Sequence, residues 1–317
     1  MNRHSVHSFL TGKQASRLAN GPAAGSSTAS GESEASPISA ENDPHHDQNF
    51  LLVIAYQICL RIGWIFKTET IIMPAVLDAI GGSGWLRGCL PMLNRLGLSL
   101  PALLASDRIR SANLKKQVLF VTTLIMGLCF LTLSVVWMVT GGQPGWPLQV
   151  TFLLIYAVFF ASTGINMLVM NTLIGKLIKT RKRGRLSLIA TLVGSVLAVS
   201  FAWWLLGHWL QGASGRSDGA RFELIFGFTG ACFVGAALLT LQFRERSDLT
   251  ASRRRNGWQL LAASVSMLKR DRNFLLLATI ASMFGIGLTL GPHYQRLASD
   301  RLELTLTALI PWVIAQN

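Results

Sequence analysis

Apolar residues in this chain gather in stretches long enough to cross a lipid bilayer, separated by short polar segments. The hydrocarbon core of a bilayer needs about 20 apolar residues in a helix. Seven such stretches and part of an eighth follow residue 50. The predicted spans are 50–80, 88–105, 117–140, 148–175, 186–210, 222–243, 273–292 and 304–317. The pattern therefore predicts an all-α, polytopic transmembrane helical bundle of about seven or eight spans.

The spacing of these stretches divides the chain into four parts. Residues 1–49 are rich in Ser, Gly, Ala and acidic residues without apolar periodicity, which predicts a disordered tail. Residues 50–243 hold six spans, 244–272 form a long basic loop, and 273–317 begin a second, incomplete bundle. The first span is too long for a straight crossing and contains Pro74, so it must tilt, kink or protrude.

The composition changes the picture by excluding a soluble globular protein. Only 14% of the 317 residues are charged and 50% are hydrophobic, whereas soluble domains carry roughly 25% charged residues. A net charge of +14 would suggest nucleic acid in a soluble protein, but here the charges lie between spans. We therefore expect the lipid bilayer as a partner and no nucleic acid. The four cysteines lie in apolar runs without metal-ligand spacing, so we predict no metal site and no cofactor.

The distribution of basic residues predicts the orientation in the membrane. Cytoplasmic loops retain Lys and Arg, and the loops after the second, fourth and sixth spans hold 18 of the 26 basic residues that follow residue 50. The N-terminus is therefore expected in the cytoplasm. We expect a multi-pass protein of the plasma (inner) membrane.

Three stretches carry finer structural signals. In the basic loop, Trp258, Leu261, Val265 and Leu268 share one helical face after three arginines, which favours a helix on the inner membrane surface over a solvated linker. Small residues spaced by four in 186–210, and again in 222–243, predict close contacts between helices. These stripes are Ala190, Gly194, Ala198 and Ala202 in the former span, and Gly227, Ala231 and Gly235 in the latter.

Ionisable and amide side chains concentrate in the first two spans, where burial in lipid costs several kcal/mol or more. They are Arg61, Lys67, Glu69, Asn94 and Arg95. If the two spans form a hairpin, Arg95 lies about one helical turn from Glu69. A static Glu69–Arg95 ion pair and a role in substrate binding or proton coupling both remain open. Arg61 and Lys67 have a further alternative, because long basic side chains also reach toward an interface.

Two amides lie in the otherwise apolar fourth span. They are Asn166 and Asn171. Hydrogen bonds between helices are favoured over contacts with a ligand, but both readings stay open.

Three local motifs add a resemblance to a known family. The segment SDRIRSANLKK follows the second span, NTLIGKLIKTRKRGRLSL joins the fourth and fifth, and IIMPAVLDAIGG ends the first. Together with the topology, they resemble the major facilitator superfamily. The resemblance makes Asp107, Arg108, Arg183 and Arg185 candidates for a cytoplasmic gating loop.

This resemblance implies a secondary active transporter of a small solute that works by alternating access, with a proton or ion as a coupling partner. The family has twelve helices in two halves, so the resemblance also implies a chain truncated in its second half. An inactive transporter-derived fragment is therefore one alternative.

A polytopic membrane enzyme acting on a lipid or lipid-linked substrate is the other alternative. Such an enzyme should gather acids, histidines or nucleophiles at an interface. Here the acids are scarce and the histidines scattered. We therefore predict a protein that is not an enzyme.

Overall fold

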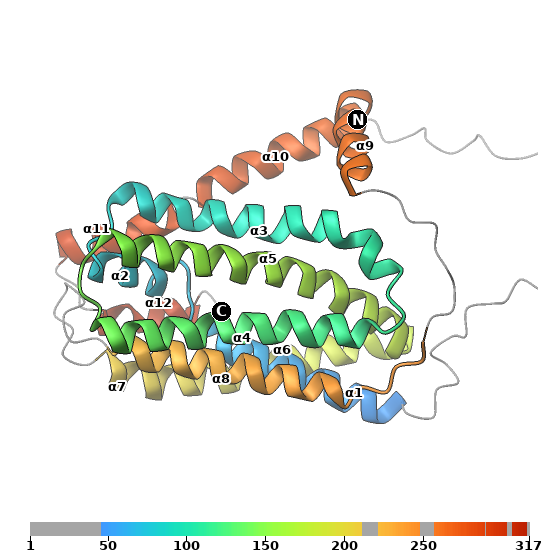
Figure 1. Ribbon diagram of the computed structural model, residues 1–317, viewed down its shortest axis with the longest axis horizontal. Coiled ribbons are helices and arrows are strands. Elements are labelled where there is room, and N and C mark those ends of the chain that lie inside the picture. The colour runs from blue at the N-terminus through green and yellow to red at the C-terminus, as the bar shows by residue number, and fades with distance from the viewer. Residues whose placement is uncertain (1–45, 211–220, 248–256, 289, 303–305, 316–317) are drawn as a thin grey trace, which may run out of the picture. The chain divides into compact units, whose positions relative to one another are not determined.

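Every regular element in the described part of the chain is a helix (Figure 1). The computed structural model describes residues 46–210, 221–247, 257–288, 290–302 and 306–315. The long helices are α1 (His46–Ile65), α3 (Gly84–Arg110), α4 (Lys115–Thr140), α5 (Trp146–Leu177), α6 (Thr180–Phe201) and α8 (Phe222–Leu241). The remaining ones are α2 (Ile72–Ala79), α7 (Gly207–Trp209), α9 (Gly257–Arg270), α10 (Arg272–Leu288), α11 (Gly291–Leu302) and α12 (Ile310–Ala315). A π-helical turn, Ala202–Leu206, joins α6 to α7, and a 3₁₀ turn, Thr307–Leu309, precedes α12.

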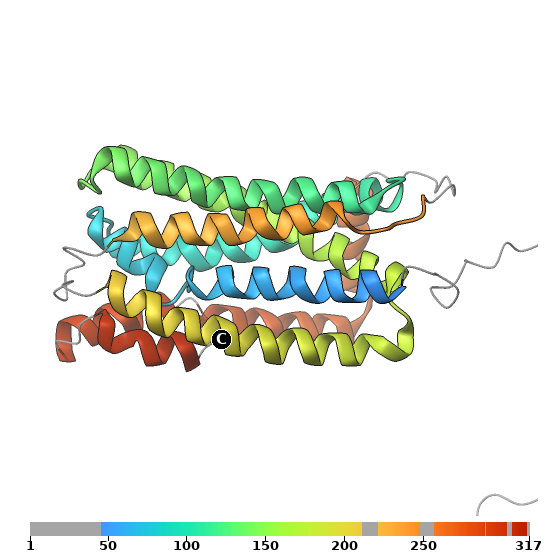
Figure 2. The same ribbon diagram turned by 90° about the horizontal axis from the view of Figure 1, so that it is seen from below.

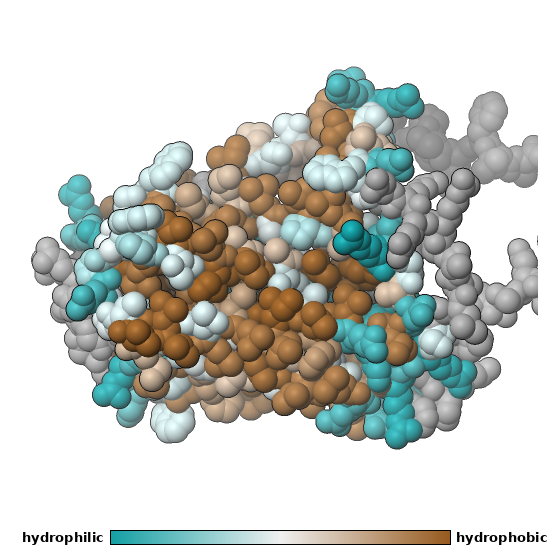
Figure 3. Space-filling model, viewed as in Figure 1, coloured by the Kyte–Doolittle hydropathy of each residue, from teal (hydrophilic) through white to brown (hydrophobic). Residues whose placement is uncertain are grey.

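The predicted all-α membrane bundle is confirmed. Seven helical segments among the described residues are long and apolar enough to cross a membrane. Apolar side chains cover the middle of the face in Figure 3, and polar ones gather at both ends. The chain is therefore an integral, multi-pass membrane protein.

The structure differs from the sequence pattern at the start of the first span. Helix α1 begins at His46, inside the predicted tail, whose residues 1–45 lie outside the described part. His46 Nδ1 lies 3.3 Å from the Leu177 carbonyl oxygen, and Asn49 exchanges two 3.0 Å hydrogen bonds with the backbone of Arg244. These polar contacts extend the helix beyond the apolar run.

The helices pack in neighbouring pairs. Helix α4 lies along α8, and α3 lies along α5. Helix α1 packs against both α6 and α8, and Figure 2 shows it between them. Helix α4 ends at Gly141, which has a φ of +60°, and Pro147 lies in the first turn of α5.

The two predicted stripes of small residues agree with the structure to different degrees. The stripe in α6 is buried against α1, as predicted, and a Cβ added at Gly194 would lie 3.1 Å from Arg61 Cδ. The stripe in α8 is confirmed at Gly227, where an added Cβ would lie 3.2 Å from Ser134 Oγ of α4, but Ala231 is exposed and the other close contact falls on a different residue. An added Cβ at Gly235 would meet nothing within 4 Å, whereas one at Gly230 would lie 2.9 Å from the Gly127 carbonyl oxygen of α4. The rotation of the helix about its axis decides which small residues face a neighbour.

Aromatic rings fill the centre of the bundle. Phe130 of α4 packs against Phe159 of α5 at 4.9 Å between ring centroids, and against Phe226 and Phe233 of α8 at 6.1 and 5.9 Å. Such pairs contribute about 0.5–1.5 kcal/mol each beyond the area they bury. Because lipid is as apolar as a side chain, this packing is what holds the helices together.

The basic loop contains the predicted helix, and the span after it is unusually exposed. Helix α9 begins against α3, where a Cβ added at Gly257 would lie 2.8 Å from the Leu104 carbonyl oxygen. Trp258 and Val265 of α9 are exposed, and a location on the membrane surface stays a prediction. The apolar window of the segment from Arg272 to Leu302 has no buried residue among those described.

Candidate functional site

The first predicted span is interrupted at residues 66–71, between α1 and α2. Pro74 lacks the N–H that would bond to the carbonyl of Thr70, which favours a break just before it. The Thr68 carbonyl accepts from the N–H groups of Ile72 and Met73 at 3.0 and 3.1 Å, and its hydroxyl donates to the Ile65 carbonyl at 2.7 Å. The kink left open by the sequence is therefore a complete break with two residues of opposite charge inside it.

These two residues, Lys67 and Glu69, form an ion pair. Lys67 Nζ lies 2.7 Å from Glu69 Oε1. The Lys67 side chain is 1% exposed and that of Glu69 is 21% exposed, so the acid is the less enclosed member of the pair.

Aromatic rings surround the ammonium group of Lys67. Its Nζ lies 3.7 Å from the ring centroid of Trp64, 4.4 Å from that of Phe160 and 5.1 Å from that of Phe159. Cations within about 6 Å of an aromatic face are attracted to it. The two phenylalanines lie near the middle of α5, so the pair lies deep within the bundle.

Two further polar side chains lie around the pair, Asn94 of α3 bonded to Glu69 and Tyr156 of α5 packed on a ring that contacts Lys67. Asn94 Nδ2 donates a short hydrogen bond to Glu69 Oε2. Tyr156 is fully buried and edge-on to Phe160 at 4.8 Å, and the same Phe160 ring contacts the Lys67 ammonium. Neither Asn94 Oδ1 nor the Tyr156 hydroxyl has a hydrogen-bond partner among the described residues. We call Lys67, Glu69, Asn94 and Tyr156 the helix-break cluster.

The Glu69–Arg95 ion pair, one of the two readings that the sequence left open, does not form among the described residues. Arg95 is exposed and forms no ion pair within the described part of the chain. Adjacent residues of a helix point about 100° apart. The rotation of α3 that brings Asn94 to Glu69 therefore turns Arg95 away, and Lys67 takes its place.

Arg61 belongs to a contact between helices. Its Nη1 donates to Ser195 Oγ of α6 at 2.6 Å. It lies on α1 beside Gly194, away from the interruption in the helix.

Asn166 joins a buried network that links α1, α4 and α5. Its Nδ2 donates to Thr123 Oγ1 at 2.7 Å, and its Oδ1 accepts from the Tyr56 hydroxyl at 3.0 Å. These are the hydrogen bonds between helices that the sequence favoured. Asn171, by contrast, is exposed.

The candidates for a gating loop are dispersed. Arg183 donates to the carbonyls of Ile178 and Gly175 at 3.1 and 2.7 Å, so it caps the end of α5. Arg108 and Arg185 are exposed. Asp107 Oδ2 is buried without a hydrogen-bond partner among the described residues.

Two ionic clusters at the helix ends were missed by the sequence reasoning. At the basic end, Glu245 is fully buried, 2.9 Å from Lys176 Nζ, and accepts from the Lys116 N–H at 2.8 Å. At the other end, Asp78 pairs with Arg87 at 2.5 Å and with Arg296 at 3.7 Å. Arg87 lies nine residues from Asp78, but the other partners are distant along the chain, so no local spacing could have revealed those pairs.

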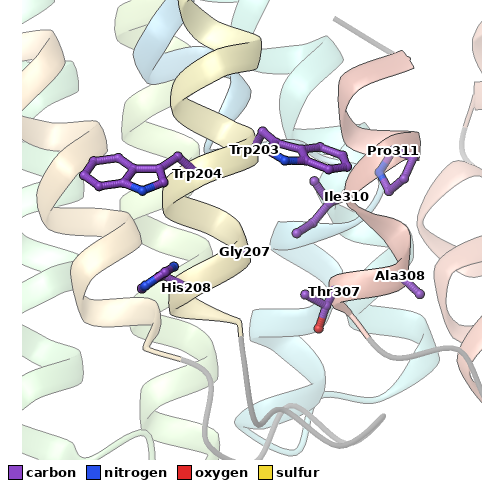
Figure 4. A pocket seen from close by; sticks show the side chains of 8 residues that line it. All are labelled: Trp203, Trp204, Gly207, His208, Thr307, Ala308, Ile310 and Pro311. Atoms are coloured by element: carbon purple, nitrogen blue, oxygen red, sulfur yellow. The ribbon is translucent and has the colours of Figure 1, made fainter.

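A cavity of about 400 Å³ lies elsewhere, between the end of the α6–α7 segment and α12 (Figure 4). Trp203, Trp204 and His208 line one side, and Thr307 and Ile310 line the other. Its walls are largely apolar, and His208 is the one titratable residue among those that line it. The helix-break cluster carries much more polar chemistry, so we place the candidate site there.

Comparison with known proteins did not identify a relative of this chain. No family model matches this chain, and no curated protein or solved structure is significantly similar to it.

Proposed function

We propose that this protein is a secondary active transporter of a small solute, built like a major facilitator superfamily transporter and working by alternating access. The observation that carries the proposal is the interruption of the first span around the buried Lys67–Glu69 pair. Discontinuous helices deep in the membrane form substrate and ion sites in many transporters, because their freed backbone and charged groups are tolerated only where they line a site.

The energetic cost of the pair supports the same proposal. Ionised groups within the membrane are expensive, and a structural role is more cheaply filled by apolar residues of the same size. Glu69 and Lys67 pair with each other and leave Asn94 and Tyr156 with unused hydrogen-bonding capacity. A site that binds and releases a solute needs such capacity. We place the N-terminus in the cytoplasm and the protein in the plasma membrane.

Uptake into proteoliposomes tests this function. The chain is reconstituted, a proton gradient is imposed, and accumulation of radiolabelled amines, amino acids, sugars and carboxylates is measured against protein-free vesicles. We expect saturable accumulation of one class, lost in Glu69→Gln. The control Glu223→Gln, at the start of α8, should accumulate as the wild type does. Uptake no greater than in protein-free vesicles across the panel would refute the proposal.

A further inference from the structure

Helix α9 (Gly257–Arg270) runs across the direction of the long helices, near the basic end of the bundle (Figure 1). Its first residue packs on α3, where a Cβ added at Gly257 would lie 2.8 Å from the Leu104 carbonyl oxygen. Leu104 is about 9 Å from the end of α3 at Arg110, at 1.5 Å per residue. Helices on a membrane surface reach about 5–10 Å into the boundary between headgroups and acyl chains. The start of α9 therefore lies as far inside the basic end as such a helix requires.

The two faces of α9 differ in chemistry. Residues spaced by three and four form an apolar face, which comprises Trp258, Leu261, Val265 and Leu268. Gln259, Ser266 and Arg270 lie on the opposite face. Trp258 is 64% exposed and Val265 is 51% exposed, so the part of the chain that the structure describes leaves much of the apolar face uncovered.

Basic side chains gather where α9 ends and α10 (Arg272–Leu288) begins. Lys269, Arg270 and Arg272 are all exposed, and none of them forms an ion pair among the residues that the structure describes. Asp271 lies among them, but its Oδ1 accepts from the N–H groups of Asn273 and Phe274 at 2.9 and 3.3 Å. This carboxylate therefore caps the start of α10, and the junction keeps a net positive charge.

We propose that Lys269, Arg270 and Arg272 bind the phosphate of an anionic phospholipid, whose acyl chains pack against the apolar face of α9. Basic residues immediately beside a membrane span attract anionic lipids in this way. The headgroup complements the charge of the junction, and the acyl chains complement the exposed face. The inference goes beyond the proposed transport function, because it concerns the surface of the basic loop and not the helix-break cluster.

The side chains suit a lipid better than a free anion. The guanidinium groups of Arg270 and Arg272 can each donate two parallel hydrogen bonds to phosphate oxygens. Lys269 lies at the edge of the apolar face, so its stem can follow acyl chains while its ammonium reaches a headgroup. Free phosphate would satisfy these charges but leave Trp258 and Val265 in contact with water.

Energy transfer to labelled lipids tests the proposal in the full chain. In a variant without the four native cysteines, a donor dye is attached at Ala263→Cys, which lies off the apolar face. The protein is reconstituted in phosphatidylcholine nanodiscs with a trace of phosphatidylglycerol or of phosphatidylcholine that carries the acceptor on an acyl chain. We expect labelled phosphatidylglycerol to be enriched near the dye by about fivefold or more over labelled phosphatidylcholine, since one basic residue at a surface contributes about that factor.

Two triple variants separate the junction from the general charge of the loops. Changing Lys269, Arg270 and Arg272 to Gln should abolish the preference for phosphatidylglycerol. The matched control changes three basic residues in the first turns of α6 to Gln and should keep the preference; they are Arg181, Lys182 and Arg185. High salt should weaken the preference, because it screens exposed charges. Millimolar inorganic phosphate should leave it unchanged.

Several results would overturn the inference. They are equal transfer to the two lipids in the parent protein, a preference that survives in the junction variant, a preference lost in the α6 control, and a preference abolished by inorganic phosphate. The parent protein decides the matter even if a variant fails to fold. Uptake into proteoliposomes is a separate measurement, so saturable uptake without a lipid preference would remove this inference alone, and a lipid preference without uptake would remove the transport function alone.

Discussion

A Cβ added at Gly164 of α5 would lie 2.6 Å from the carbonyl oxygen of Gly97 in α3, so the two helices cross backbone against backbone. The approach is reciprocal, because a Cβ added at Gly97 would lie 2.5 Å from Phe160 Cβ. This crossing fixes α3 against α5 about one turn from Asn94, which belongs to the helix-break cluster, and from Phe160, whose ring contacts the Lys67 ammonium.

Gly164→Ala should therefore destabilise the protein. Overpacking of this kind costs about 1–3 kcal/mol. The control is Gly175→Ala in the same helix, where an added Cβ meets nothing within 4 Å. It should be neutral or slightly stabilising, because Ala is the better helix former. Thermal unfolding in detergent measures both, and equal midpoints for the two variants would contradict the close crossing.

Asn166→Ala should lower stability by removing hydrogen bonds among α1, α4 and α5. The change leaves the Tyr56 hydroxyl with one fewer partner and costs about 1–2 kcal/mol. Asn171→Ala, an exposed amide five residues further along the same helix, is the matched control and should have little effect. If Asn171→Ala proved the more harmful of the two, the assignment of the inward face of α5 would be incorrect.

The two ion pairs at the basic end should differ in their contributions. Glu245→Ala removes a fully buried carboxylate bonded to Lys176 and to the Lys116 N–H, and should cost about 2 kcal/mol. Lys182→Ala breaks a pair with Asp47 in which both side chains are largely exposed, and such pairs contribute little. Urea or SDS unfolding followed by tryptophan fluorescence compares them. A larger loss for Lys182→Ala would be inconsistent with these burials.

The orientation can be tested by labelling with a membrane-impermeant maleimide in a variant without native cysteines. Gln143→Cys lies between α4 and α5 and should react from outside the cell. Ser111→Cys lies between α3 and α4 and should react only after the membrane is opened. The reverse pattern would overturn the orientation argued from the basic loops.

The sequence predicts the spans well because length and apolar content define them. The sequence also predicts the stripe of small residues in α6. Four small residues at spacings of four lie on one face of the helix, and a neighbouring helix can pack closely against that face. The sequence does not predict how α3 and α8 are rotated about their own axes. Asn94 and Arg95 are both polar neighbours, and only the tertiary packing decides which of them meets Glu69. The sequence does not identify Tyr156 as a site residue either, because a single tyrosine in an apolar span is typical of a packed core.

The segment between α1 and α2 satisfies many of its own backbone hydrogen-bonding groups. This affects how tightly a solute can bind there. The Trp64 carbonyl accepts from the Lys67 N–H, and the Ile65 carbonyl accepts from the Thr68 hydroxyl. The helix is therefore already interrupted before a ligand binds at Glu69, and these two carbonyl groups already accept hydrogen bonds. Less of the ligand's binding free energy is lost to reorganisation of this part of the backbone, so even a solute of few atoms can be recognised there.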